Sequence, residues 1–205
     1  MLAGESLSKR EVLILAGLSE LFLVILSLVW IYFADLNVTL NASLDSAFIG
    51  AIATIPLILF NVCLSTYAAK NKKSIWFSFL HTTILPLCKN LDPVSALVVG
   101  IMAGIGEELF FRATVANHLI LLFGISISAL LSSLLFSLMH FGNAFLKLLP
   151  ISLVYFCVGA YLFTEYVWSK SLLSVIVTHA LYNWFAIIYL RSKFIESHHL
   201  SKSPS

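Results

Sequence analysis

Hydrophobic runs long enough to cross a lipid bilayer fill most of this chain. A transmembrane helix needs about 20 consecutive, mostly apolar residues, and such runs recur between residues 12 and 190. Hydrophobic residues make up 60% of the 205 residues and charged residues only 11%, whereas about 25% of residues are charged in an ordinary soluble domain. The sequence therefore predicts an all-α, polytopic integral membrane protein built as a helical bundle.

About six transmembrane spans are expected, with seven or eight as the alternatives. The predicted spans cover residues 12–34, 47–69, 94–119, 126–141, 145–166 and 171–190. Another apolar segment, 75–88, is short and contains Pro86 near its end, so we interpret it as an interfacial or re-entrant helix. No linker or repeat divides the chain, which is expected to be a single membrane domain over 1–205 with a disordered polar tail at 197–205.

Lysine and arginine gather on one side of the predicted spans. Cytoplasmic loops of membrane proteins carry an excess of these residues. With six spans, one side would hold Lys9, Arg10, Lys70, Lys72, Lys73, Lys89, Lys147, Arg191, Lys193 and Lys202. Lys170 would lie on the other side. We therefore predict that both termini are cytoplasmic. The membrane itself is expected to be a bacterial plasma membrane.

Two classes of function find no support in the composition. Cys63, Cys88 and Cys157 lie singly in apolar runs, without the spacing of a disulfide framework or a thiolate metal site. No basic patch interleaved with aromatic residues occurs, so no nucleic acid partner is expected. The lipid bilayer is the expected partner.

Two adjacent glutamates, Glu107 and Glu108, lie inside an apolar run. An unpaired charge there is costly unless it has a partner or water. Arg112 follows Glu108 by four residues, so on a helix the two share a face and can pair. Glu107 lacks a local counter-ion, and such a carboxylate suits a general base or acid. Before them, Gly100 and Gly104 form a GxxxG step, which favours close packing of helices.

Polar side chains also occur in two later spans. Phe136 and His140 are four residues apart, as are His179 and Asn183. Each His or Asn alone is typical of interhelical hydrogen bonding. Together with Glu107 they supply a base for water and donors for an oxyanion, which are the parts of a hydrolytic site. Other polar residues lack such partners in sequence, and we interpret them as span-end or packing residues: Glu20, Asn61, His81, His118 and Glu165.

Read in order, residues 107–112 form EExxxR, residues 136–140 form FxxxH and residues 179–183 form HxxxN. This set resembles the CAAX prenyl protease and bacteriocin-processing (CPBP or Abi) family of intramembrane endopeptidases. The resemblance covers about residues 94–190, which would be the catalytic core. It implies a helical membrane protein whose motif residues surround a water-filled cavity, with a membrane-associated peptide or protein as substrate.

The resemblance also implies roles for the motif residues. Glu107 would activate water with help from His140, while His179 and Asn183 would stabilise the oxyanion. Glu108 and Arg112 would be the supporting pair. No cofactor is favoured, because the family resemblance points to a glutamate-type protease. The alternative is a zinc site formed by Glu107, His140 and His179, since two His and one Glu is a known catalytic ligand set.

Two functions of other classes remain as alternatives. One is a non-proteolytic bacteriocin-immunity protein or membrane scaffold of the same fold. The other is a small transporter or proton-linked channel, because intramembrane Glu and His also form proton relays. For the endopeptidase, the substrate could be a prenylated C-terminal peptide, a leader peptide or another membrane protein.

Overall fold

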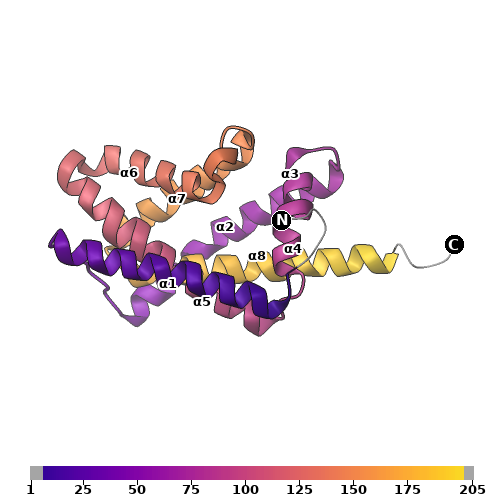
Figure 1. The fold of residues 1–205 in the computed structure, drawn as a ribbon, viewed down its shortest axis with the longest axis horizontal. Coiled ribbons are helices and arrows are strands. Elements are labelled where there is room, and N and C mark those ends of the chain that lie inside the picture. The colour runs from indigo at the N-terminus through magenta and orange to yellow at the C-terminus, as the bar shows by residue number, and fades with distance from the viewer. Residues whose placement is uncertain (1–6, 201–205) are drawn as a thin grey trace.

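The computed structural model describes the backbone of residues 7–200 and the side chains of residues 7–193. This part of the chain forms a bundle of helices without strands (Figure 1), as predicted. The long helices are α1 Lys9–Phe33, α2 Leu44–Lys70, α5 Pro93–Glu108, α6 Asn117–Phe141, α7 Leu149–Ser169 and α8 Leu172–Leu200. The short elements are α3 Ile75–Phe79, α4 Leu85–Cys88, the π-helices η1 Leu80–Ile84 and η2 Leu109–Ala116, and the 3₁₀-helix η3 Gly142–Ala144.

Five helical stretches of the described chain are long and apolar enough to cross a membrane. One of them, Pro93–Ala144, has 52 residues. As a straight helix it would be about 78 Å long, more than twice the roughly 30 Å of hydrocarbon in a bilayer. Gly124 interrupts it with φ 75° and ψ 174°, a backbone conformation that only glycine adopts easily. The two parts correspond to the spans predicted over 94–119 and 126–141.

The connections between the long helices lie at two opposite ends of the bundle. At one end Lys9 Nζ lies 2.8 Å from Asp92 Oδ2, which joins the start of α1 to the start of α5. At the other end the N–H of Leu172 donates to the carbonyl of Thr39 at 3.3 Å, which joins the start of α8 to the loop after α1. We call the first of these the basic end. The loops therefore alternate between the ends as the six-span prediction requires.

The segment between α2 and α5 begins and ends at the basic end. Helix α2 runs in the same direction as α8, since Thr54 contacts the carbonyl of Thr178 and Asn61 contacts Tyr182 one to two turns further along both helices. Helix α8 reaches the start of α5, where Trp184 donates to the carbonyl of Pro93 at 3.0 Å. The elements α3, η1 and α4 thus connect two points at the same end. They form a short apolar segment, in agreement with the interfacial or re-entrant helix that was predicted, and the alternative of a seventh span stays a prediction.

Helices α5 and α8 pack backbone to backbone. A methyl group at Gly100 would lie 2.6 Å from the carbonyl oxygen of Ala180, and one at Gly104 would lie 2.8 Å from that of Ile176. Both distances are too short for a carbon–oxygen contact, so only glycine fits. The predicted packing role of the GxxxG step is confirmed, and it sets the last turn of α5 against α8.

Two other features of the chain also bear on the sequence predictions. Cys63, Cys88 and Cys157 are free thiols, as expected. Helix α8 continues to Leu200, into the predicted disordered tail 197–205, and residues 201–205 lie outside the described residues.

Candidate active site

The two glutamates stand where α5 changes its helical type. Helix α5 ends at Glu108, and the chain continues directly into the π-helix η2. Such π-helical turns inside α-helices are often found at functional sites. Adjacent residues on a helix point about 100° apart, so the two carboxylates face different surroundings. The side chain of Glu107 is 14% exposed, whereas that of Glu108 is 0% exposed.

Glu108 is bound on both of its oxygens. Arg112 Nε lies 3.0 Å from Oε2, and His179 Nδ1 lies 2.6 Å from Oε1. Arg112 also donates to the carbonyl of Gly159 at 3.1 Å, and its guanidinium lies 4.9 Å from the ring centre of Phe136. The predicted pair of Glu108 and Arg112 is therefore confirmed. The bond between Glu108 and His179 is additional, and no spacing in the sequence indicated it.

Glu107 faces both histidines of the motifs. Its Oε2 atom lies 3.7 Å from Nε2 of His140 and 4.0 Å from Nε2 of His179. Nδ1 of His140 lies 2.8 Å from the carbonyl of Phe136, and because a carbonyl only accepts, this nitrogen carries the hydrogen. With both Nδ1 atoms occupied by other partners, both Nε2 atoms are turned toward Glu107. The three side chains come from α5, α6 and α8.

The short length of the second part of α6 explains how His140 comes close to Glu107. His140 lies one residue before the end of α6, whereas Glu107 lies about 21 Å along its own helix from Pro93. The part of α6 after Gly124 covers only residues 125–141, about 25 Å, and the chain turns at Gly142 with φ 49°. This part therefore ends close to Glu107, where His140 faces the Glu107 carboxylate. Its last residue, Phe141, is buried against Phe79 of α3 and Ile151 of α7.

Asn183 is the one predicted site residue that joins no contact at Glu107. It follows His179 by one turn of α8 and is half-buried. Within residues 7–193, its carboxamide has no hydrogen-bond partner. The structure thus brings together Glu107, Glu108, Arg112, His140 and His179, and leaves the Asn183 side chain unengaged.

Glu20 of α1 lies beside the two glutamates, and the sequence interpretation as a span-end or packing residue missed this. A methyl group at Gly106 would lie 3.0 Å from Cβ of Glu20 and 3.1 Å from its Cα, so α1 touches α5 just before Glu107. Oε2 of Glu20 is enclosed and has no hydrogen-bond partner within the described residues. Glu107 and His179 are near enough to interact with it electrostatically. The sequence feature that could have indicated Glu20 as a site residue is its position as an acidic residue within an apolar run.

Two more residues support the site from α7. Glu165 accepts hydrogen bonds from Ser174 and Thr178 of α8, each at 2.7 Å, and Thr178 directly precedes His179. The ring of Tyr155 lies 4.8 Å from the ring of His140. Sequence spacing could not reveal these contacts, because each one joins different helices.

The arrangement of donors does not correspond to a metal centre. Within residues 7–193, no group of three or more His, Cys, Asp or Glu side chains is arranged to hold a metal ion. Zinc would require nitrogen and oxygen ligands at about 2.0–2.2 Å around one point. The Nε2 atoms of His140 and His179 are directed at the carboxylate of Glu107 itself. We therefore derive no step through a metal, and the zinc alternative stays a prediction.

The segment that carries these residues matches a known family. Residues 89–185 match the family model of the type II CAAX prenyl endopeptidase Rce1-like proteins. This segment is Rce1-like. The match confirms the resemblance predicted from the three motifs, all of which lie within the Rce1-like segment. Neither a curated protein nor a solved structure matches the chain significantly.

The match and the helices together indicate the broad nature of the protein. The apolar helices are long enough to cross a membrane, and the Rce1-like segment is similar to type II CAAX prenyl endopeptidases. The protein is therefore an integral membrane protein that contains a segment similar to an endopeptidase family. Glu20, which contacts the site from α1, lies outside the Rce1-like segment.

Proposed function

We propose that this protein is a glutamate-type intramembrane endopeptidase that hydrolyses a peptide bond of a membrane-associated peptide or protein. One observation carries the proposal: the Glu107 carboxylate faces the Nε2 atoms of His140 and His179 at 3.7 and 4.0 Å. Both distances exceed the 2.7–3.2 Å of an ordinary N–H···O hydrogen bond. The three groups therefore surround a common point where a reacting atom would be held.

In the proposed reaction Glu107 acts first as a base and then as an acid. Its carboxylate takes a proton from water while the oxygen adds to the carbonyl carbon of the scissile bond. The negative charge then lies on the former carbonyl oxygen. When the carbon–nitrogen bond breaks, the protonated Glu107 gives its proton to the leaving nitrogen. The products are a carboxylic acid and an amine, and the enzyme is returned to its initial state.

The ion pair behind His179 would orient it for this reaction. Glu108, held by Arg112, bonds Nδ1 of His179 and fixes the direction of its ring. Because Nδ1 would donate to the Glu108 carboxylate, Nε2 is a donor only when both ring nitrogens carry hydrogen. The Nε2–H of His179 would donate to the oxyanion, together with the unengaged carboxamide of Asn183. His140 would hold the attacking water through Nε2.

The family match and the position of the site support a proposal for the substrate class. Type II CAAX prenyl endopeptidases are the proteins to which the segment is similar, so a prenylated C-terminal peptide is the first candidate. A leader peptide of a bacteriocin is the second. We further propose that the basic end of the bundle faces the cytoplasm of a bacterial cell, because several lysines of the described residues lie there: Lys9, Lys70, Lys72, Lys73, Lys89 and Lys193.

Peptide cleavage by purified protein in liposomes tests the proposal. The substrates are a fluorogenic prenylated CAAX peptide and a panel of leader peptides. Glu107→Gln keeps the size of the side chain and removes the base, and it should lower the rate at least 100-fold. The control Asp45→Asn removes a carboxylate at the start of α2, far from the site, and should keep the wild-type rate. Full activity of Glu107→Gln would refute the proposed mechanism.

The same assay separates the glutamate mechanism from the zinc alternative. Dialysis against 1,10-phenanthroline should leave the rate unchanged. A loss that added zinc restores would instead assign Glu107, His140 and His179 as metal ligands. A wild-type protein that cleaves none of the peptides, combined with cellular rescue by Glu107→Gln, would favour the non-proteolytic alternative.

A further inference from the structure

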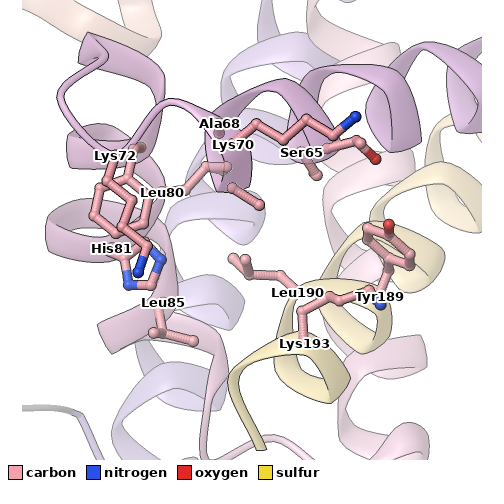
Figure 2. A pocket seen from close by; sticks show the side chains of 13 residues that line it. Ser65, Ala68, Lys70, Lys72, Leu80, His81, Leu85, Tyr189, Leu190 and Lys193 are labelled. Carbon is pink, nitrogen blue, oxygen red and sulfur yellow. The ribbon is translucent and has the colours of Figure 1, made fainter. Parts of the chain in front are cut away.

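A second candidate site lies at the basic end of the bundle, away from Glu107. It is a cavity of about 530 Å³ between the last turns of α2, the α3–η1–α4 segment and α8. Figure 2 shows the side chains around it, with Lys72 and His81 on one wall and Tyr189, Leu190 and Lys193 on the opposite one. On α8, Lys193 is 14 residues beyond His179, which corresponds to about 21 Å along the helix.

The charge around this cavity is one-sided. Among the residues whose side chains are described, 7–193, its lining includes the cations Lys70, Lys72 and Lys193 together with His81, and no Asp or Glu. Partial burial lowers the pKa of His81, and the ammonium group of Lys72 lowers it further. At neutral pH His81 is therefore uncharged and offers a hydrogen-bonding ring nitrogen beside Lys72. The lining thus presents a positive field with polar groups that can bind an anion.

Much of the remaining lining is apolar, beside the hydroxyl groups of Ser65, Thr66 and Tyr189. Phe77, Leu80, Leu85 and Leu190 form this part of the wall, and Leu85 is 4% exposed. A free inorganic anion would gain nothing from such a wall. An amphiphile with an anionic head and a hydrocarbon tail would contact both parts. The volume is within the range of roughly 300–1,000 Å³ that is usual for sites of small ligands.

We propose that this cavity binds the headgroup of an anionic phospholipid. The phosphate would lie near Lys72 and His81, which Figure 2 shows side by side on one wall, with Lys70 adding to the positive field. The first carbons of the acyl chains would lie against the leucines. Charge complementarity and location support this occupant. Basic pockets between transmembrane helices at the cytoplasmic side are known to hold anionic lipid headgroups, and this cavity lies at the end of the bundle where the basic residues gather. The proposal does not depend on the proposed protease activity.

Binding of two lipids to purified protein in detergent tests this inference. Native mass spectrometry would measure the affinity for a phosphatidylglycerol and for the phosphatidylcholine with the same acyl chains. The variant Lys70→Gln/Lys72→Gln removes two charges from the lining. The control Lys73→Gln/Lys89→Gln removes two charges from the same end of the bundle, at positions that do not line the cavity. The variant Lys70→Arg/Lys72→Arg keeps the charge and checks that the fold tolerates substitution there.

Wild-type protein should prefer phosphatidylglycerol. The cavity variant should lose about 25-fold in that affinity, since each lysine near a membrane surface contributes about a fivefold factor. The control and the arginine variant should stay near the wild-type value, and phosphatidylcholine binding should not change. Equal losses in the cavity variant and the control would overturn the proposal, because surface charge would then suffice. Displacement of the lipid by millimolar inorganic phosphate would also overturn it, because the site would then be one for a free anion.

Discussion

Replacing Gly104 with alanine is expected to separate α5 from α8 and to impair the candidate active site. The added methyl group would lie 2.8 Å from the carbonyl oxygen of Ile176 and 3.3 Å from both N and Cβ of Ala180. All three atoms belong to α8, and two of them are backbone atoms that cannot rotate away. The two helices must therefore move apart by a few tenths of an ångström.

The expected size of the effect follows from this geometry. Overpacking of a closely packed interior costs about 1–3 kcal/mol, and in a chain of this length each kcal/mol lowers the melting temperature by about 2–4 °C. At an overpacking cost of about 2 kcal/mol, the melting temperature of Gly104→Ala should therefore lie roughly 4–8 °C below that of wild type. Glu107 is on α5 and His179 is on α8, 4.0 Å apart. A misplacement of 1 Å can cost about 100-fold in rate, so about tenfold is expected here.

Thermal unfolding in detergent and the peptide-cleavage assay would measure both effects. Gly17→Ala is the matched control, because the nearest atom to its added methyl group is Met102 Sδ at 3.9 Å, an ordinary contact. It should keep the melting temperature and the rate of wild type. If Gly104→Ala behaves like Gly17→Ala in both measurements, the close packing of α5 on α8 does not set the geometry of the site.

Two more predictions concern charged pairs. Arg112→Met replaces the cation of a buried ion pair, because the side chains of Arg112 and Glu108 are 2% and 0% exposed. The free energy of unfolding, measured with denaturant, should fall by about 3–5 kcal/mol. A decrease below about 1 kcal/mol would contradict a buried ion pair. Lys9→Met removes the hydrogen bond from Lys9 to Asp92. This bond, together with those from Ser95, holds the pKa of Asp92 below its usual range. A lowered carboxylate pKa stabilises the fold above the unfolded value of about 4, and this contribution is lost as the pH falls through the lower folded value. The melting temperatures of wild type and Lys9→Met should therefore differ most above pH about 5, begin to approach each other as the pH falls below about 4, and coincide only below the lowered folded pKa, whereas a constant difference would refute the linkage.

The sequence by itself determined the features that depend on local spacing. Apolar runs of about 20 residues fixed the spans, and the distribution of Lys and Arg indicated which loops share an end. A separation of four residues was enough to pair Glu108 with Arg112, because residues at that spacing adjoin on a helix. The three motifs pointed to the Rce1-like segment, which residues 89–185 confirm.

Only the tertiary structure decided which helices contact one another and which residues along each helix form the contact. The bond from His179 to Glu108 and the contact of Glu20 with Gly106 join segments far apart in the chain. Apolar faces of membrane helices look alike in sequence, so periodicity gives no partner for a polar residue on them. Gly100 and Gly104 set the distance between α5 and α8, and the break at Gly124 sets the position of α6 along the bundle. They turn a glutamate without a local partner into one that faces two histidines.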